Sequence, residues 1–543
     1  MNKVGKLEVI LLLALLIVGY FSFNHIMGLR AEEPRRAVVG IEALLGDNAL
    51  IPKIHGEPYY NKPPVYNWVL ATSFLIHDSF SPSAVRFPGV LSLWIIAALL
   101  FWLLRKHDEW KTALFAPIIF LTFGDLIFYG AVNAGEIDLF YALLVFLQVT
   151  AIFHFHQKKQ ILLLFLVSYF FAAAGALTKG LPSVAFQGLT VLGYLAWVRD
   201  WKSLLSWKHV AGILLFTCLV GGYFFAYSKH ENALAFMLNL WSESSSKSAN
   251  NAGYDSIFKA IYTFPLQLLQ ITLPWSIFFI WSKKAKWNQS PLAVFSLVFI
   301  GVNIWIYWIA PELRNRYLYA FFPFLAILIA QLISKLVQTE KFDFKLSRIS
   351  AILAVIIGLA FIALPFLEVL PLEQTAQIDF FICGFLFLAI ALFQFRFPQN
   401  GFLHVALLLA FLRISYNICI LPVQAAESKS MHYSNQMDRI IELAGGQDVY
   451  WTGYPYSFQP ELSLAGNHFL KDSLATPPLL AYQIPYYYSL STGNRLLYMA
   501  QPIAETWLLG EKQYALNMGG EIHFEFKDKW MQNTLVLYQV EKP

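Results

Sequence analysis

Charged and hydrogen-bonding side chains gather in one early stretch of the chain, between apolar runs at 7–24 and 88–104. They include Arg30, Glu32, Glu33, Arg35, Arg36, Lys53, His55, Glu57, Asn61 and Lys62. A carboxylate within reach of a hydroxyl can act as a general base, and cations can stabilise a phosphate as it departs. These residue types therefore predict a site for displacement from an anionic group.

A second acidic group, Glu136 and Asp138, comes just before the apolar run at 138–155, with Asp125 nearby. Carboxylates at such positions also serve as helix N-terminal caps, which is the alternative explanation. If both acidic groups lie on the same side of a membrane, they can converge on one cavity. The candidates to hold a charged leaving group on that side are Lys62, Lys179, Arg314, Arg316 and Tyr317.

The residues after Glu32 and Glu33 predict a short helix from Pro34 to about Leu45, because proline suits the first helical position. Two explanations fit this helix. It either presents the two carboxylates to a site, or lies amphipathically at the membrane interface with its charges solvated.

The elements that must position these groups are membrane spans. Of the 543 residues, 57% are hydrophobic and only 13% are charged, whereas a soluble domain has roughly 25% charged residues. Since about 20 apolar residues cross a bilayer, the repeated apolar runs predict about thirteen spans. They are expected at 7–24, 88–104, 112–130, 138–155, 161–178, 181–198, 209–227, 264–282, 290–309, 317–336, 349–367, 377–395 and 401–421.

Basic residues fall in every second connection between these spans. Examples are Arg105, Lys106, Lys158, Lys159, Arg199, Lys283, Lys284, Lys341 and Arg396. Cytoplasmic loops are enriched in lysine and arginine, so the N-terminus is expected in the cytoplasm. Residues 25–87 and 228–263 then lie outside, and an odd number of spans also leaves the tail outside.

The tail, residues 422–543, has mixed polarity and alternating stretches, of which 449–452, 495–499 and 534–538 are typical of strands. We therefore predict a polytopic α-helical membrane domain over 1–421, with its catalytic first outside loop at 25–87. An extracytoplasmic α/β or α+β domain is expected over 422–543.

The composition argues against other classes of protein. The net charge of +5 is small and comes mainly from short basic loops, so nucleic-acid binding is not indicated. The cysteines at 218, 383 and 419 lie in apolar runs, which points to small buried side chains rather than a disulfide framework or zinc site. A transporter or flippase of a lipid-linked substrate is the competing class. It is disfavoured because the polar groups gather in outside loops and no internal repeat is visible.

Several spaced motifs follow one another in the first part of the chain. The first is Glu32-Glu33-Pro34-Arg35-Arg36-Ala37, followed by Tyr59-Tyr60-Asn61-Lys62-Pro63-Pro64 and Tyr66-Asn67-Trp68. The others are Arg86, Glu136-Ile137-Asp138, Thr178-Lys179-Gly180, Leu273-Pro274-Trp275 and Arg316-Tyr317. In this order the motifs resemble those of the lipid A aminoarabinose transferases and related bacterial enzymes of the protein O-mannosyltransferase superfamily. The motifs cover about residues 7–330, and the layout of spans and tail extends the resemblance over the chain.

The resemblance implies a GT-C glycosyltransferase of the cell (inner) membrane with an outward-facing site, periplasmic in a Gram-negative cell. It also implies a polyprenyl-phosphate sugar donor and an inverting displacement onto a glycolipid such as lipid A, a glycan or a protein. By position, Glu32 and Asp138 match the family's catalytic acidic residues, Lys62 the phosphate-contacting lysine and Tyr317 a tyrosine near that phosphate. Arg316 joins the donor-phosphate group, with Glu33, Arg35, Glu136 and Lys179 in support.

The chain departs from the family pattern at several positions. Glu32 replaces an aspartate, Arg36 replaces the usual tyrosine and Asn61 fills a position that is often acidic. No arginine stands between Ala233 and Lys259, where relatives often place one for the phosphate; Lys247 or Lys259 is the candidate substitute.

No cofactor is required by these motifs, and a divalent metal stays open as an alternative. Glu32, Glu136 and Asp138 would be its ligands, although no close spacing such as His-Glu-x-x-His occurs. His55 is expected to be a loop residue rather than a ligand. Arg413, inside the last expected span, is expected to face the protein interior or a lipid phosphate.

Overall fold

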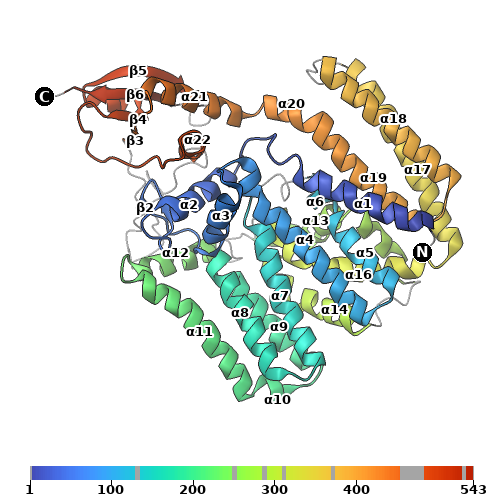
Figure 1. The fold of residues 1–543 in the computed structure, drawn as a ribbon. Coiled ribbons are helices and arrows are strands. Elements are labelled where there is room, and N and C mark those ends of the chain that lie inside the picture. Colours follow the sequence, from blue (N-terminus) through green and yellow to red (C-terminus); the bar gives the residue numbers. More distant parts are fainter. Residues whose placement is uncertain are drawn as a thin grey trace.

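The computed structural model describes residues 3–128, 135–246, 254–283, 290–308, 314–367, 374–452, 482–528 and 533–541. Figure 1 shows a largely helical molecule in which the N-terminus and the C-terminal sheet lie at opposite ends. The short elements of the first outside loop, α2 and α3, lie at the same end as that sheet.

Within the described residues, nine helical segments are long and apolar enough to cross a membrane. They are Pro82–His107 (α4), Asp138–Gln157 (α7), Ile161–Lys179 (α8), Trp207–Tyr227 (α11), Pro291–Trp308 (α14 and α15), Asn315–Leu336 (η3 and α16), Glu340–Phe366 (α17 and η4), Ala376–Arg396 (in α18, Gln374–Arg396) and Gly401–Ala426 (α19, η5 and α20). The chain is thus a polytopic α-helical membrane protein.

Of the other four expected spans, one is an uninterrupted 19-residue helix and three are shorter or interrupted, so the count of about thirteen full-length spans is not confirmed. The first is covered by α1 (Lys3–Phe21). The others are α5 (Trp110–Leu121) with α6 (Gly124–Phe128), the 16-residue α9 (Pro182–Trp197), and a pair bent by 114° between Ile261–Ile271 and Trp275–Trp281. Pro274 lies at that bend and has no N–H to continue the helix.

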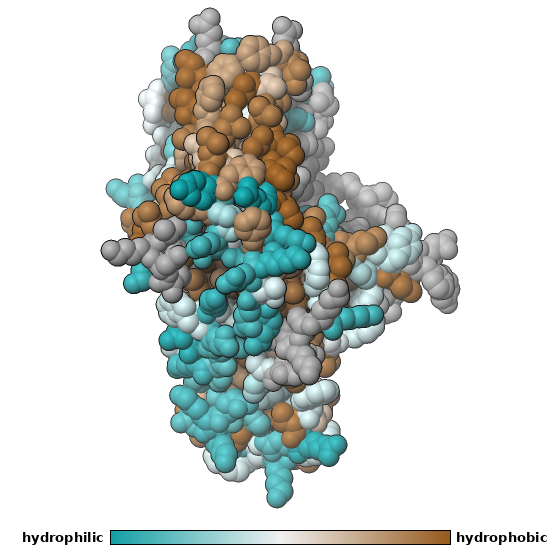
Figure 2. Space-filling model, turned by 90° about the vertical axis from the view of Figure 1, so that its right-hand side faces the viewer, coloured by the Kyte–Doolittle hydropathy of each residue, from teal (hydrophilic) through white to brown (hydrophobic). Residues whose placement is uncertain are grey.

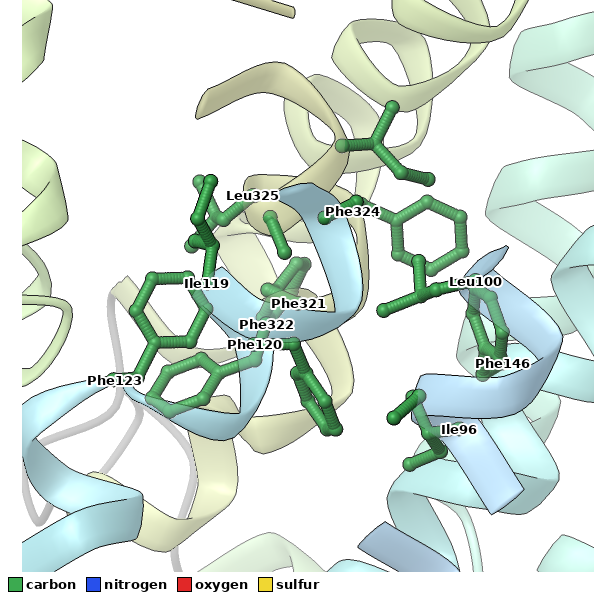
Figure 3. Packing of buried hydrophobic residues seen from close by; sticks show 14 of the residues in the cluster. Ile96, Leu100, Ile119, Phe120, Phe123, Phe146, Phe321, Phe322, Phe324 and Leu325 are labelled. Carbon is green, nitrogen blue, oxygen red and sulfur yellow. The ribbon is translucent and has the colours of Figure 1, made fainter. Parts of the chain in front are cut away.

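A large apolar core joins α4, α5, α7 and the segment Asn315–Leu336. Figure 3 shows Ile96 and Leu100 of α4 and Phe146 of α7 near a set of aromatic rings. Those rings include Phe120, Phe123, Phe321, Phe322 and Phe324, all of them buried. This packing fixes η3 (Asn315–Phe321), which carries Arg316 and Tyr317, against the helices that follow the outside loops.

A hairpin of α17 (Glu340–Ala363) and α18 presents apolar side chains outward. Exposed examples are Ile349, Ile352, Ile356, Leu359, Ile382, Phe385 and Leu392. Figure 2 shows the face on the right of Figure 1, with hydrophobic residues covering its upper part, at the height of α17 and α18, and hydrophilic residues below. An exposed apolar surface of this extent suits contact with lipid tails.

Residues 25–87, the expected first outside loop, contain α2 (Glu33–Leu45), a two-stranded antiparallel sheet of β1 (Lys53–Ile54) and β2 (Glu57–Pro58), and α3 (Val65–His77). The predicted short helix is therefore confirmed. Its charged residues Glu33, Arg35, Arg36 and Glu42 are buried. An interfacial helix with solvated charges was the wrong alternative, since α2 packs within the protein.

The C-terminal segment (residues 422–543) contains α21 (Lys429–Ala444), α22 (Gln483–Thr492), α23 (Lys512–Asn517) and a four-stranded sheet in the order β3-β4-β6-β5. The strands are β3 (Val449–Trp451), β4 (Trp507–Glu511), β5 (Gly520–Lys527) and β6 (Thr534–Val540), with β3–β4 parallel and the other pairs antiparallel. Two of the expected strands are present. Residues 495–499 are not a strand and contribute only an isolated bridge from Tyr498 to Trp451.

The remaining helices are α10 (Trp201–Leu204), α12 (Ala233–Ser246) and α13 (Tyr254–Ile271). Arg413 in α19 is buried and donates to the carbonyl oxygen of Ile127 at 2.6 Å, so it faces the interior as expected. Cys383 and Cys419 are buried as expected, whereas Cys218 is exposed on α11.

Candidate active site

Glu33 and Arg86 form a fully buried ion pair at the start of α2. Arg86 Nε and Nη2 donate to the two carboxylate oxygens of Glu33 at 2.8 and 2.9 Å, with side-chain exposures of 1% and 0%. Arg86 also donates to the carbonyl oxygens of Asn24, Met27 and Gly28. Glu33 accepts from the backbone N–H groups of Arg30 and Gly135. A bidentate pair with this many further hydrogen bonds is saturated, so Glu33 holds the loop in place rather than facing a substrate.

Glu32 occupies the N-cap position of α2, one residue before this buried pair. Its carboxylate is ion-paired with Arg35, and Arg36 Nη2 lies 3.6 Å from its Oε2. The Nε of Arg35 is buried and has no hydrogen-bond partner among the described residues. The Glu32–Arg35 pair therefore retains hydrogen-bonding capacity that the Glu33–Arg86 pair has used.

Glu136 and Asp138 face two cations from other parts of the chain. Lys179, the last residue of α8, pairs with Asp138. Arg316 of η3 pairs with Glu136, and its Nε lies 3.5 Å from Asp138 Oδ2. The Lys179 ammonium also lies over the rings of Tyr141 and Tyr317, at 4.9 and 4.7 Å from their centroids.

The two segments that are expected to be outside loops meet at this cluster. Arg36 of α2 interacts electrostatically with both Glu136 and Asp138. The buried Tyr66 of α3 donates to the carbonyl oxygen of Glu136 at 3.2 Å. Burial raises the pKa of Glu136 to about 7, with further contributions from Asp138 and Glu33, although Arg316 opposes the shift. The structure thus gathers Glu32, Glu33, Arg35, Glu136, Asp138, Lys179, Arg316 and Tyr317 around the start of α2 and the N-terminus of α7.

Asp125 was noted in the sequence without a role, and it holds the segment that carries Arg316 and Tyr317. Its carboxylate accepts from Asn315 Nδ2 at 2.9 Å and from the Tyr319 hydroxyl at 2.6 Å. Those two residues flank Arg316 and Tyr317 in η3, so α6 and η3 are tied together. An asparagine and a tyrosine at this spacing gave no signal in the sequence.

Lys62 lies partly buried between β2 and α3. Close to it, Asn239 of α12 donates to the carbonyl oxygen of Tyr60 at 2.9 Å, which ties this turn to α12. Lys247 lies outside the described residues, and the Lys259 side chain is not described.

In the part of the chain that the structure describes, no three or more His, Cys, Asp and Glu side chains are arranged to hold a metal ion. His55 has another role. Its Nδ1 lies 2.7 Å from the carbonyl oxygen of Leu496, and its ring stacks on that of Trp451. Burial lowers the pKa of His55 to about 4, so it is a neutral packing residue as expected of a loop position.

Comparisons with known proteins agree with this architecture. Residues 61–222 match the family model described as dolichyl-phosphate-mannose-protein mannosyltransferase. An undecaprenyl phosphate-alpha-4-amino-4-deoxy-L-arabinose arabinosyl transferase of Enterobacter sp. (strain 638) is 26% identical over 356 residues, covering 62% of this chain and 61% of the relative. The enzyme of the same name from Pseudomonas aeruginosa (strain LESB58) is 25% identical over 287 residues, covering 49% and 50%.

Among solved structures, ArnT from Cupriavidus metallidurans superposes on nearly the whole chain. The apo form has a TM-score of 0.68 at 14% identity and covers 98% of both chains. The form bound to undecaprenyl phosphate has a TM-score of 0.67 at 14% identity and covers 99% of this chain and 98% of that one.

The fold and the clustered charges define a polytopic membrane protein with a cluster of carboxylates and cations around the start of α2 and the N-terminus of α7. The chain shares the fold of ArnT from Cupriavidus metallidurans, and its residues 61–222 are similar to the mannosyltransferase family model. The sequence match spans about three fifths of the length of the Enterobacter relative (61%).

Proposed function

We propose that the chain is a membrane glycosyltransferase that moves a sugar from a polyprenyl-phosphate carrier to an extracytoplasmic acceptor by inverting displacement. The observation that carries the proposal is the meeting of the two outside loops at one cluster. There, the carboxylates of Glu32 and Asp138 lie among Arg36, Lys179 and Arg316. Carboxylates beside partly exposed cations suit removal of a proton from an acceptor and departure of a phosphate.

In the proposed reaction, an acceptor oxygen attacks the anomeric carbon of the sugar. The bond from that carbon to the phosphate oxygen breaks, and the lipid phosphate leaves with the electron pair. Glu32 accepts the proton of an acceptor hydroxyl, with Asp138 orienting the groups around it. If the acceptor is itself a phosphate, it arrives anionic and Glu32 mainly positions it.

The leaving phosphate needs positive charge, which we assign to Arg316 and Lys62 with Tyr317, supported by Lys179. Arg316 has a side-chain exposure of 21% and Lys179 of 12%, so both cations are reachable while held by carboxylates. A phosphate that arrives can share them with Glu136 and Asp138. Glu33, saturated by Arg86, supports the site by fixing the start of α2.

The relatives support the choice of donor. Two are named as transferases that use undecaprenyl phosphate-linked aminoarabinose, and one structure of the same fold holds undecaprenyl phosphate. We extend a donor of this class to the present chain, with lipid A or another glycolipid, a glycan or a protein as acceptor. The separation of the N-terminus from the C-terminal sheet (Figure 1) suits a cytoplasmic N-terminus and an outward-facing site in the inner membrane.

The test uses the purified chain in nanodiscs with polyprenyl-phosphate-linked sugars and an acceptor-rich extract of the native membrane. Mass spectrometry follows free polyprenyl phosphate and the glycosylated acceptor together. Release of the carrier matched by a new glycoconjugate is expected. If the carrier stays intact yet crosses the bilayer in liposomes, the chain is a flippase and not a transferase.

A further inference from the structure

The C-terminal segment contacts the first outside loop on both sides of Glu32. Ser430 Oγ and Gln483 Nε2 each donate to the carbonyl oxygen of Leu29 at 2.7 Å. Farther along the loop, Arg495 Nη1 donates to Glu42 Oε2 at 3.1 Å. Figure 1 shows α22 lying between the C-terminal sheet and α2. The residues that begin α22 are therefore fixed against the loop that carries the proposed base.

Tyr482, at the start of α22, contacts Arg35 of the Glu32–Arg35 ion pair. The Arg35 guanidinium lies over the ring of Tyr482, with its carbon 5.7 Å from the ring centroid. Tyr482 is the N-cap of α22 and is 1% exposed. Arg35 is thus held between the Tyr482 ring, contributed by the C-terminal segment, and the Glu32 carboxylate on its own helix.

From this geometry we infer that Tyr482 is a positioning residue for the transfer reaction and that the C-terminal segment completes the active site. The inference rests on the proposed function. Tyr482 holds the Arg35 guanidinium by a cation–π contact, and Arg35 in turn orients the Glu32 carboxylate toward the acceptor. Because Arg35 Nε is buried without a hydrogen-bond partner among the described residues, it is also available to an acceptor oxygen beside Glu32.

This arrangement has two physical consequences. An arginine that keeps its place beside a carboxylate favours the ionised form, so loss of the Tyr482 ring should move the pH dependence of turnover to higher pH. A guanidinium that loses the ring samples other rotamers, so the carboxylate it holds is positioned less often for attack. A misplaced catalytic group lowers kcat, whereas it has little effect on binding of the donor phosphate, which other residues hold.

The experiment compares Tyr482→Phe and Tyr482→Leu in nanodiscs, with release of polyprenyl phosphate measured across pH. Tyr482→Phe keeps the ring and should keep wild-type turnover. Tyr482→Leu should lose about 10-fold to 30-fold in kcat, with little change in KM for the donor, and its pH profile should move to higher pH.

Tyr488→Leu is the matched control, because Tyr488 is buried in the same helix and its hydroxyl accepts a hydrogen bond from the backbone N–H of Val449. It should lower thermal stability without moving the pH profile. The inference is overturned if Tyr482→Leu and Tyr482→Phe lose kcat to the same extent. It is also overturned if Tyr482→Leu keeps the wild-type kcat while Glu32→Gln is inactive. If wild type itself releases no carrier, the proposed function fails instead.

Discussion

Two neighbouring glutamates at the start of α2 are built into very different surroundings. Glu33 is completely buried, paired through both oxygens with Arg86 and bonded to two backbone N–H groups. Glu32 is paired with Arg35 and approached by Arg36, and it stays partly exposed. A saturated carboxylate has no capacity left for a substrate, whereas a partly satisfied one does.

The same distinction separates their cations. Arg86 makes all its bonds inside the protein, while Lys179 and Arg316 pair with Asp138 and Glu136 and keep part of their surface accessible. We therefore propose that the charges that the fold leaves incompletely paired carry the function at this end of the molecule. The remaining buried charges act as supports for them.

The largest effect on turnover is expected from Glu32→Gln, which removes the proposed base and keeps the side-chain shape. Turnover should fall by about 10²-fold to 10⁴-fold, as expected for a general base, while thermal stability stays at the wild-type value. Carrier release measured by mass spectrometry checks this. The control is Glu57→Gln, an exposed glutamate in the same loop, which should leave turnover unchanged.

Removal of the supporting cation should act on the fold instead. Arg86→Gln leaves the Glu33 charge buried without its partner, which costs about 3–5 kcal/mol of stability. Arg495→Gln, which breaks the less buried pair with Glu42, should cost much less. Thermal unfolding of both variants in the same detergent measures the difference. Equal losses of stability in the two variants would show that the deeper burial of the Glu33–Arg86 pair does not increase the cost of breaking it.

Removal of a proposed phosphate-binding cation should lower activity less than loss of the base does. Lys179→Ala removes one charge near the departing phosphate and should lower kcat/KM for the donor by about 10²-fold. Lys229→Ala, an exposed lysine in another expected outside loop, is the control. Steady-state kinetics with varied donor concentration test the pair. A defect seen only as a higher KM for the acceptor would move Lys179 from the donor side to the acceptor side.

The smallest expected effect is a change of stability with pH at Glu136. Burial raises its pKa from 4.5 to about 7, so between these values the folded chain holds a proton that the unfolded chain has released. Stability should therefore fall as pH rises through this window and level off above it. Glu136→Gln should flatten that slope in thermal unfolding between pH 4.5 and 8. Parallel curves for the variant and wild type would contradict the assigned shift.

Much of the arrangement could be predicted from the sequence because membrane spans and loop charges are local signals. Apolar runs located the long helices, and the spacing of proline after two glutamates located α2. The interrupted segments were overcounted as full spans. Hydrophobicity alone does not register a break such as the one at Pro274, where the chain bends by 114°.

The pairings of the charges could not be predicted in the same way. Glu33 with Arg86 and Arg316 with Glu136 join residues far apart in the sequence, and only packing decides which carboxylate is saturated. The contact of Tyr482 with Arg35 spans two segments without any shared motif. Residue types in the loops therefore indicated the chemistry, whereas only the fold shows that Glu33 is saturated by its partners and Glu32 is not.

The most direct test of the account measures carrier release by Glu32→Gln and Glu33→Gln side by side, normalised to folded protein in nanodiscs. We expect Glu32→Gln to be stable and almost inactive, and Glu33→Gln to be destabilised but active per folded molecule. A Glu32→Gln variant with wild-type turnover, or a stable Glu33→Gln variant without turnover, would contradict it.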